Sequence, residues 1–404
     1  MAAALLRAGV TIFTRSIKYH RPRGPFCLGG SCGQCLMRVD GVPSLPACRV
    51  LARAGSSCQR QNAPLGSVEA DVLRAADFLF PAGLDHHHLF TSSRALGRVA
   101  LELARRLGGL GELPDRELPP IPGRAREVEV AVVGAGPAGL AAAAEQGADA
   151  VVIEREAAPG GASLFGIDPG CAEPSWVEQT ARALGDRLWL RSEAVGLYVD
   201  ATPLLAVQGP QGLTALRARR VVVATGGVSQ PLAFPGVDRP GVYAARGLVK
   251  LARDHGVRVG ASLVVVGEGE ELIHCSRALV REGYRLEALV DAGDEPCPAP
   301  ADLPWRRARP LRAKGNPVRR LVLDDGARID CDAVAIALPP APLHELASGA
   351  GARTRFQQGG FAVEADERGR TDVPWLFAAG RVAGRGGGQA RDSGVAAGRE
   401  AAHG

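Results

Sequence analysis

The sequence predicts an α/β protein of the doubly wound class with a small cysteine-rich module in front of it. Two segments, 128–154 and 262–291, each have the pattern of strand, glycine-rich turn, helix and strand. Four closely spaced cysteines lie upstream, within residues 27–48. Repeated β-turn-α units usually build a parallel sheet covered by helices. The 404 residues are enough for about two to four domains.

The composition is that of a globular protein, with 46% hydrophobic and 23% charged residues. The net charge of +5 is too diffuse to indicate a nucleic-acid partner. An excess of basic residues over 15–60 favours an acidic partner or a phosphate-bearing cofactor. The first residues lack the features of a signal peptide, and no apolar run of about 18 residues exists, so we expect no membrane span.

The cysteines follow the spacing Cys27-x4-Cys32-x2-Cys35-x12-Cys48, which is typical of the loop around a plant-type [2Fe–2S] cluster. The intervening glycines (Gly29, Gly30 and Gly33) allow the positive φ that such a tight loop needs. A zinc knot and unrelated buried thiols are the alternatives, but only Cys32 and Cys35 form a zinc-type knuckle. The other five cysteines are scattered, which fits a reducing compartment, and we expect a cytoplasmic protein.

The rest of the N-terminal third carries weaker signals. Residues 36–41 predict a short strand ending in an Asp40-Gly41 hairpin turn. Apolar spacing predicts helices within 68–112, and prolines make 113–126 a linker. A basic stripe (Lys18, His20, Arg21 and Arg23) is interpreted as a solvated or salt-bridging face, with cofactor or partner docking as the alternative. We interpret His86–His88 as a surface run, and Asp77, Phe78 and Phe80 as packing residues.

The first glycine-rich turn is Gly134-x-Gly136-x-x-Gly139, which contains Pro137 and Ala138. It lies between an apolar strand and an Ala-rich helix, the context that makes this motif a dinucleotide-binding signal. Glycines permit the tight turn, the approach of a pyrophosphate and close helix packing, and the helix N-terminus offers free N–H groups. Glu154 follows the next strand, where it would accept hydrogen bonds from ribose hydroxyls. Arg155 and Gly161 complete the expected set.

The second turn, Gly267-x-Gly269, is degenerate, because Glu271 or Leu272 stands near the place of the third glycine. Asp291 ends the following strand. Nucleotide binding and a merely structural Rossmann half both remain open here.

Two more strands end in candidate ligand-contacting residues. Residues 219–243 contain a strand that runs into Thr225 and Gly226, and residues 372–384 contain one that ends at Gly380 and Arg381. The carboxyl ends of parallel strands are where α/β folds place ligands, so we expect these four residues beside a cofactor.

The order of motifs resembles a known family. GAGPAGL, then ATGG with a downstream PG, then a second GxG and finally LFAAG are similar to the two-dinucleotide-domain flavoproteins over about residues 127–400. The resemblance implies that the first motif binds the FAD pyrophosphate, that the ATG strand passes near the FAD, and that the second motif lies in an inserted NAD-type domain for NAD(P).

The N-terminal strings RSIKYHRPRGPF and SSCQRQNAPLGSVEADVLRAADFLFPAG resemble the α subunit of heterotetrameric sarcosine oxidase. They are also similar to the hydrogen cyanide synthase, opine oxidase and hydroxyproline dehydrogenase group. This resemblance implies a ferredoxin-like β-grasp module and an electron-transfer flavoprotein subunit of a sarcosine-, proline- or opine-type oxidase or dehydrogenase. A separate FAD-containing β subunit would oxidise the amine or amino acid.

The sequence departs from this pattern in four places. The family has two strands and a turn before the point where this sequence begins, so we expect either a truncated β-grasp module or a protein that starts further upstream. The helix after Gly139 is short, since Gly147 follows closely. Arg381 replaces the aspartate of the family's LFAAGD, where it would pair with a phosphate. The folate-binding C-terminal half is absent, so formaldehyde capture is not expected.

The predicted domains are residues 1–62 (the [2Fe–2S] module), 63–126 (a connector and linker), 127–235 with 338–404 (FAD-binding) and 236–337 (inserted, NAD-type). Two alternative functions remain: a stand-alone NAD(P)H-dependent ferredoxin-type reductase that uses the Gly267 turn, and a degenerate assembly protein without catalysis. The cysteines outside the quartet lack a C-x2-C pair, so disulfide-reductase chemistry is not expected. No residue is identified as a general base.

Overall fold

The computed structural model describes residues 1–17, 19–62, 70–72, 75, 78, 97–99, 102, 120–168, 170, 172–295, 297–357 and 359–403. Most of the predicted helical stretch 68–112 lies outside these residues, as do Lys18, Asp77, Phe80, His86–His88 and Cys171. The described chain forms two compact units. Residues 1–117 and 231–338 make the first unit, and residues 118–230 and 339–404 make the second.

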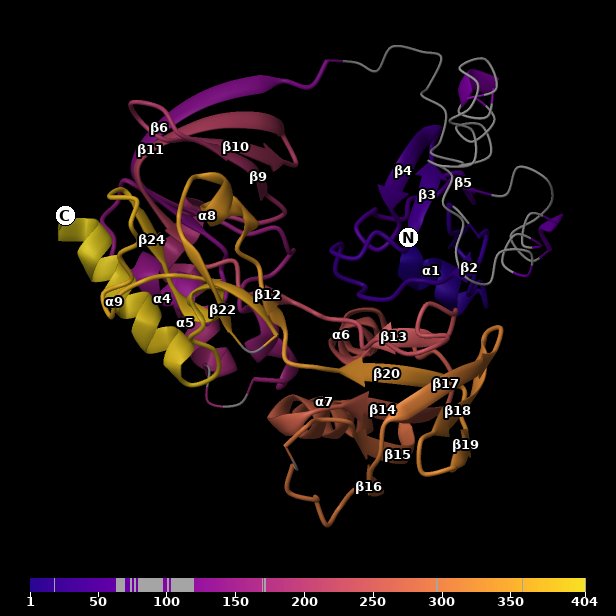
Figure 1. Ribbon diagram of the computed structural model, residues 1–404. Helices are drawn as coiled ribbons and strands as arrows, with labels where there is room; N and C mark the ends of the chain where they lie inside the picture. Colours follow the sequence, from indigo (N-terminus) through magenta and orange to yellow (C-terminus); the bar gives the residue numbers. More distant parts are fainter. Residues whose placement is uncertain are drawn as a thin grey trace. The chain divides into compact units, whose positions relative to one another are not determined.

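The second unit is built on a seven-stranded sheet (Figure 1). Its strand order is β8-β7-β6-β11-β10-β9, and β24 pairs with β11. Strands β6, β7, β8, β11 and β24 are parallel, whereas β9 and β10 join as an antiparallel meander. The bounds are β6 Gly123–Val133, β7 Ala150–Ile153, β8 Leu188–Trp189, β9 Glu193–Tyr198, β10 Leu204–Gly209, β11 Gly212–Val223 and β24 Leu376–Ala378. Strand β6 therefore begins inside the predicted linker, because residues 123–126 pair with β11.

Two helices pack against each other beside this sheet. Helix α4 (Pro137–Ala144) begins with a proline at its first position, where the missing N–H costs nothing. It has only eight residues, which confirms the predicted short helix. Helix α9 (Gln389–His403) approaches it closely, because a Cβ on Gly394 or Gly398 would overlap the α4 backbone. These glycines allow α9 to pack closely on α4, the helix that follows the candidate dinucleotide turn.

Shorter elements complete the second unit. They are helices α5 (Pro174–Leu184) and α8 (Glu345–Gly349), the 3-10 turns η2 (Gly161–Phe165), η3 (Gly185–Arg187) and η4 (Gly380–Ala383), and two ribbons, β12 (Gly227–Val228) with β21 (Ala341–Pro342) and β22 (Thr354–Gln357) with β23 (Gly360–Val363).

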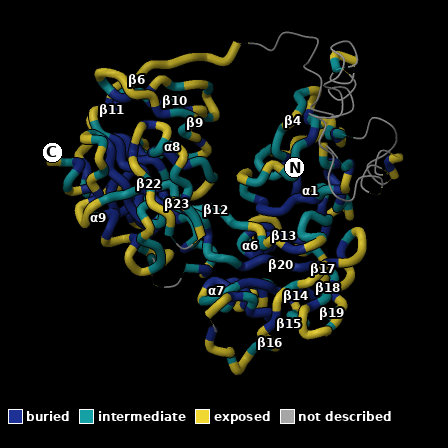
Figure 2. Tube along the Cα trace, in the orientation of Figure 1, coloured by how far each residue is buried: buried dark blue, intermediate teal, exposed yellow. Residues whose placement is uncertain are grey.

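The first unit contains a second parallel sheet, of order β13-β20-β14-β15-β16, in the inserted segment (residues 236–337). Helices α6 (Ala245–His255) and α7 (Gly269–Arg281) accompany it, and an antiparallel sheet β17-β18-β19 adds to it. Figure 2 shows the central strands as buried. The strand bounds are β13 Val242–Ala244, β14 Ser262–Gly267, β15 Arg285–Asp291, β16 Trp305–Arg307, β17 Pro310–Gly315, β18 Val318–Leu323, β19 Arg328–Asp330 and β20 Ala333–Ala337.

The cysteine module (residues 1–62) is small and made of short strands. It contains α1 (Ala2–Arg7), a pair β1 (Thr14–Arg15) and β2 (Pro22–Arg23), and a three-stranded sheet of β4 (Val42–Pro46), β3 (Leu36–Val39) and β5 (Cys58–Gln59). The turn between β3 and β4 has φ of 52° at Asp40 and 83° at Gly41, which confirms the predicted hairpin. Phe78, which we expected to pack, is exposed.

In the described part of the chain, no helix is both long and apolar enough to cross a membrane.

Candidate functional site

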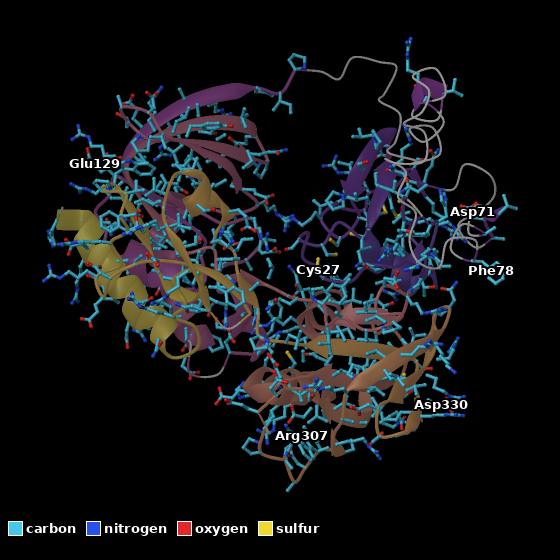
Figure 3. All side chains as sticks on the ribbon, in the orientation of Figure 1. Cys27, Asp71, Phe78, Glu129, Arg307 and Asp330 are labelled. Atoms are coloured by element: carbon cyan, nitrogen blue, oxygen red, sulfur yellow. The ribbon has the colours of Figure 1, made fainter. Side chains whose placement is uncertain are left out.

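Contacts between neighbouring thiols join the four predicted cluster ligands into one group. The Sγ atoms of Cys35 and Cys48 are 3.4 Å apart, and the thiol of Cys27 hydrogen-bonds with those of Cys32 and Cys48. No three of the described His, Cys, Asp and Glu side chains form a group around one metal ion. A [2Fe–2S] cluster has two irons and four thiolate ligands, so a group of four neighbouring thiols fits it. Figure 3 labels Cys27 in this group.

The backbone of the cysteine loop has the geometry of a sulfur-binding turn. The N–H groups of Gly29 and Ser31 donate to Cys27 Sγ at 3.4 and 3.3 Å. Gly30 and Gly33 have positive φ, as predicted, whereas Gly29 does not, and Leu28 takes a positive φ of 52° instead. The loop therefore offers N–H groups to a thiolate, which is how such proteins adjust a cluster's potential.

The thiols influence one another's protonation. Hydrogen bonds from Cys32 and Cys48, followed by those from the backbone, lower the pKa of Cys27. The bond with Cys48 likewise lowers the pKa of Cys35. Hydrogen bonds to Cys27 and Cys35 raise the pKa of Cys48. The four thiols are therefore close enough for each to change the pKa of its neighbours.

The first glycine-rich turn has the close packing that the motif predicts. Gly134 has φ of 105°, and a Cβ there would overlap the carbonyl oxygen of Ala224 at the end of β11. A Cβ on Gly139 would overlap the carbonyl oxygen of Gly134. Around Gly136 there is no atom within 4 Å of where a Cβ would lie. The N-terminus of α4, which begins at Pro137 and Ala138, therefore faces open space in which a pyrophosphate fits.

Glu154 supports this turn from the neighbouring strand. It is 8% exposed, its Oε2 accepts the N–H of Ala135 at 2.7 Å, and its Oε1 accepts the N–H of Glu156 at 2.8 Å. The expected hydrogen bonds to a ribose would have to use the remaining lone pairs of these oxygens. Arg155, beside it, contacts Glu156 at 3.7 Å.

The following loop closes over the same turn. Gly160 donates its N–H to the carbonyl of Ala135 at 2.7 Å, and a Cβ on Gly161 would lie 3.4 Å from the Cα of Gly136. Gly161, which we predicted as a cofactor-binding residue, therefore lies beside the dinucleotide turn.

Thr225 and Gly226 both hydrogen-bond with Leu343, which belongs to the later segment of the second unit. The hydroxyl of Thr225 donates to the carbonyl of Leu343 at 2.6 Å, and the N–H of Leu343 donates to the carbonyl of Gly226 at 3.1 Å. Thr225 therefore has a structural role at this sheet edge, in addition to any role beside a cofactor.

Arg381 pairs with a carboxylate that the sequence analysis did not identify. Its Nη2 lies 3.2 Å from both carboxylate oxygens of Asp168, and the two side chains are only 24% and 13% exposed. Gly386 lies against the guanidinium. The preceding residue, Gly380, donates its N–H to the buried hydroxyl of Ser393 at 2.7 Å. The expected pairing of Arg381 with a phosphate would therefore have to compete with Asp168. No local motif marks Asp168 or Ser393.

The second turn differs from the first in both shape and charge. Gly267 packs tightly on the carbonyl of Ala337, but the position of the third glycine is held by Leu272, which is fully buried. Three glutamates, Glu268, Glu270 and Glu271, occupy the N-cap and first turn of α7 near Gly269. Carboxylates at this position neutralise the helix dipole and repel a phosphate.

The remaining polar groups at this turn already have partners. Glu271 forms a bidentate ion pair with Arg246 at 2.6 and 2.7 Å. Asp291, 1% exposed, accepts the N–H groups of Gly293 and Cys297 at 3.2 and 3.0 Å. The residues present do not fit a dinucleotide pyrophosphate, whereas those of the first turn do.

Two protein families match this chain, one over the cysteine module and one over most of the remaining residues. Residues 1–63 match the 2Fe-2S iron-sulfur cluster binding domain family. Residues 128–401 match the pyridine nucleotide-disulphide oxidoreductase family.

Curated relatives of this chain are named as subunits of oxidases. The sarcosine oxidase alpha subunit of Rhizobium meliloti (strain 1021) is 27% identical over 324 residues, covering 72% of this chain and 32% of the relative. That of Corynebacterium sp. (strain P-1) is 32% identical over 41% of this chain and 19% of the relative. An opine oxidase subunit from Rhizobium meliloti is 28% identical over 40% of this chain and 38% of the relative. The chain thus spans well under half the length of these relatives.

Solved structures share the fold. An L-proline dehydrogenase from P. horikoshii superposes with a TM-score of 0.71 at 22% identity, over 98% of this chain and 68% of that one. A Lactococcus lactis thioredoxin reductase superposes with a TM-score of 0.54 at 18% identity, over 68% of this chain and 97% of that one. The chain belongs to the pyridine nucleotide-disulphide oxidoreductase family, has the fold of an FAD-dependent flavoprotein and carries an N-terminal 2Fe-2S domain.

Proposed function

We propose that this chain is the electron-transfer flavoprotein subunit of an amine or amino acid oxidoreductase of the sarcosine, proline or opine type. The observation that carries the proposal is the presence, in one chain, of four neighbouring thiols suited to a [2Fe–2S] cluster and a glycine turn suited to FAD. FAD accepts electrons in pairs and a [2Fe–2S] cluster carries one at a time, so together they convert a two-electron oxidation into single-electron transfers.

The chain's own residues would bind and orient these groups. The open N-terminus of α4 at Gly136 would receive the FAD pyrophosphate, and the buried Glu154 would fix the turn through Ala135. In the cysteine loop, Gly29 and Ser31 would donate N–H groups to the Cys27 sulfur and favour the reduced cluster.

The amine would be oxidised on a partner. Relatives at 27–32% identity are named as subunits of sarcosine and opine oxidases, which supports a hetero-oligomer with an FAD-containing β subunit. The predicted division into residues 1–62, 63–126, 127–235 with 338–404, and 236–337 belongs to this proposal. So does a cytoplasmic location, which would keep the thiols reduced.

The charge at the second turn argues against the alternative of an NAD(P)H-dependent reductase. A bound NAD(P) would bring its pyrophosphate to the N-terminus of α7, where Glu268 and Glu270 add negative charge and Glu271 is already paired. We therefore propose the second Rossmann half as structural.

Anaerobic assays of the full chain, loaded with FAD and cluster, test this function. We expect that the flavin of the chain alone is not bleached by sarcosine, proline, opines or NADH. Once the β subunit is added, the correct amine should bleach it. Rapid NADH oxidation by the chain alone would establish the reductase instead. A chain that takes up neither cofactor would support the alternative of a degenerate assembly protein.

A further inference from the structure

The chain leading into the cysteine loop covers the edge of the inserted sheet. Strand β13 is the outermost strand of that sheet, and its residue Ala244 donates its N–H to the carbonyl of Phe26 at 3.0 Å. The backbone N–H and C=O groups of an uncovered edge strand have no partner within the sheet. Here the N–H of Ala244 is paired with the residue that precedes the first cysteine.

Phe26 also belongs to the inserted segment's hydrophobic core. It is 2% exposed and packs, together with Cys27, in a cluster that includes strand residues Val242, Val264 and Val266. Cys32 is partly buried against the same cluster. Two of the four predicted ligands, Cys27 and Cys32, are therefore held by apolar side chains of a segment more than 200 residues away.

The first turn of α6 contacts the cysteine loop directly. A Cβ on Gly247 would lie 2.7 Å from the carbonyl oxygen and 3.1 Å from the carbonyl carbon of Cys27. Both are backbone atoms of a predicted ligand, which cannot rotate away as a side chain could. Gly247 is therefore required for the loop to rest on this helix.

Flanking contacts fix the same arrangement. Arg23 pairs with Asp238 at 3.3 Å, and a Cβ on Gly24 would lie 3.2 Å from the Cα of Pro240. The loop is thus attached to the inserted segment before and at its first cysteine.

We propose that the inserted segment holds the cysteine loop that binds the iron–sulfur cluster. In this proposal the N-terminal turn of α6, through Gly247, positions Cys27 and raises the cluster's reduction potential. Reduction adds negative charge to the cluster, and the positive end of a helix dipole stabilises negative charge close to it. Gly247 is a positioning residue, because it acts through Cys27. The proposal depends on the cluster and not on which amine is oxidised.

The direct test is a redox titration of Gly247→Ala in the full-length chain, monitored by electron paramagnetic resonance of the reduced cluster. We expect altered g-values and a potential lower by about 59 mV or more, which is a tenfold change in the one-electron equilibrium. Gly349→Ala is the matched control, because it makes the same change in a helix whose added Cβ meets no atom within 4 Å. A Gly247→Ala protein with wild-type potential and spectrum would overturn the proposal.

A second measurement uses the wild-type chain, so it does not depend on a variant folding. Hydrogen exchange is compared with and without the cluster. We expect the amide of Ala244 and those of the first turn of α6 to exchange at least tenfold more slowly when the cluster is present. Equal exchange in the two forms would show that the inserted segment does not hold the loop. Neither result depends on catalysis, so failure of the proposed function would appear separately in the amine assays.

Discussion

The ion pair between Arg246 and Glu271 joins α6 to α7 and is the basis of our most quantitative prediction. The two side chains are 17% and 8% exposed, and two hydrogen bonds of 2.6 and 2.7 Å connect them. Removing one partner of a buried pair costs about 3–5 kcal/mol, since the remaining charge stays buried. Because Glu271 lies in the first turn of α7, the helix dipole would recover about 1 kcal/mol. We therefore expect Arg246→Ala to destabilise the first unit by about 2–4 kcal/mol.

The assay can be restricted to the first unit. Of the chain's 4 tryptophans, only Trp305 lies in this unit, so replacing Trp176, Trp189 and Trp375 by Phe leaves a local fluorescence reporter. Urea unfolding of that protein is compared with and without Arg246→Ala.

Two controls accompany this comparison. Arg277→Ala, which removes an exposed pair with Asp302 in the same unit, should change stability by less than about 0.5 kcal/mol. Adding Glu271→Leu to Arg246→Ala should recover part of the loss, because no charge is then left buried. A loss below about 0.5 kcal/mol for Arg246→Ala would refute the reasoning.

Three further predictions concern the cofactor sites and pH. Gly139→Ala should abolish retention of FAD, because the added Cβ overlaps the turn, whereas Gly147→Ala, whose Cβ meets no atom, should retain it; flavin per chain after dialysis measures this. Cys48→Ser should lose at least half of the bound iron, and Cys58→Ser should keep it, in metal analysis of reconstituted protein; equal loss in both would contradict the ligand assignment. Burial raises the pKa of Cys331 to about 12. The folded thiol therefore holds its proton more tightly than the unfolded one, so stability present below pH of about 9 should be lost as pH rises toward 12, by up to about 1.4 kcal/mol per unit. Thermal unfolding should show a shallower decline in Cys331→Ala, and an unchanged slope would disprove this.

Local patterns explain why much of the fold was predictable. The Asp40-Gly41 turn needs two positive φ values, which this pair of residues accepts readily, and the structure confirms it. The packing of Gly139 on Gly134 follows from a motif in which side chains are sterically excluded. In both cases a few neighbouring residues determine the geometry.

The contacts that sequence reasoning missed connect distant residues. Nothing near Arg381 indicates Asp168, which is 213 positions away, and nothing near Glu271 indicates Arg246 on another helix. Likewise, nothing near Phe26 indicates that it packs in the hydrophobic core of the inserted segment, more than 200 residues away. Such pairings depend on how elements pack and have no local pattern.

Anaerobic titration of the reconstituted full-length chain, followed by absorption and electron paramagnetic resonance together, tests the central claim most directly. We predict flavin bands, about two irons and two sulfides per chain as this cluster type requires, and a cluster signal that appears as electrons are added to the flavin. A colourless or zinc-loaded protein, or a flavin that is reduced while the cluster stays oxidised at every potential, would contradict the account.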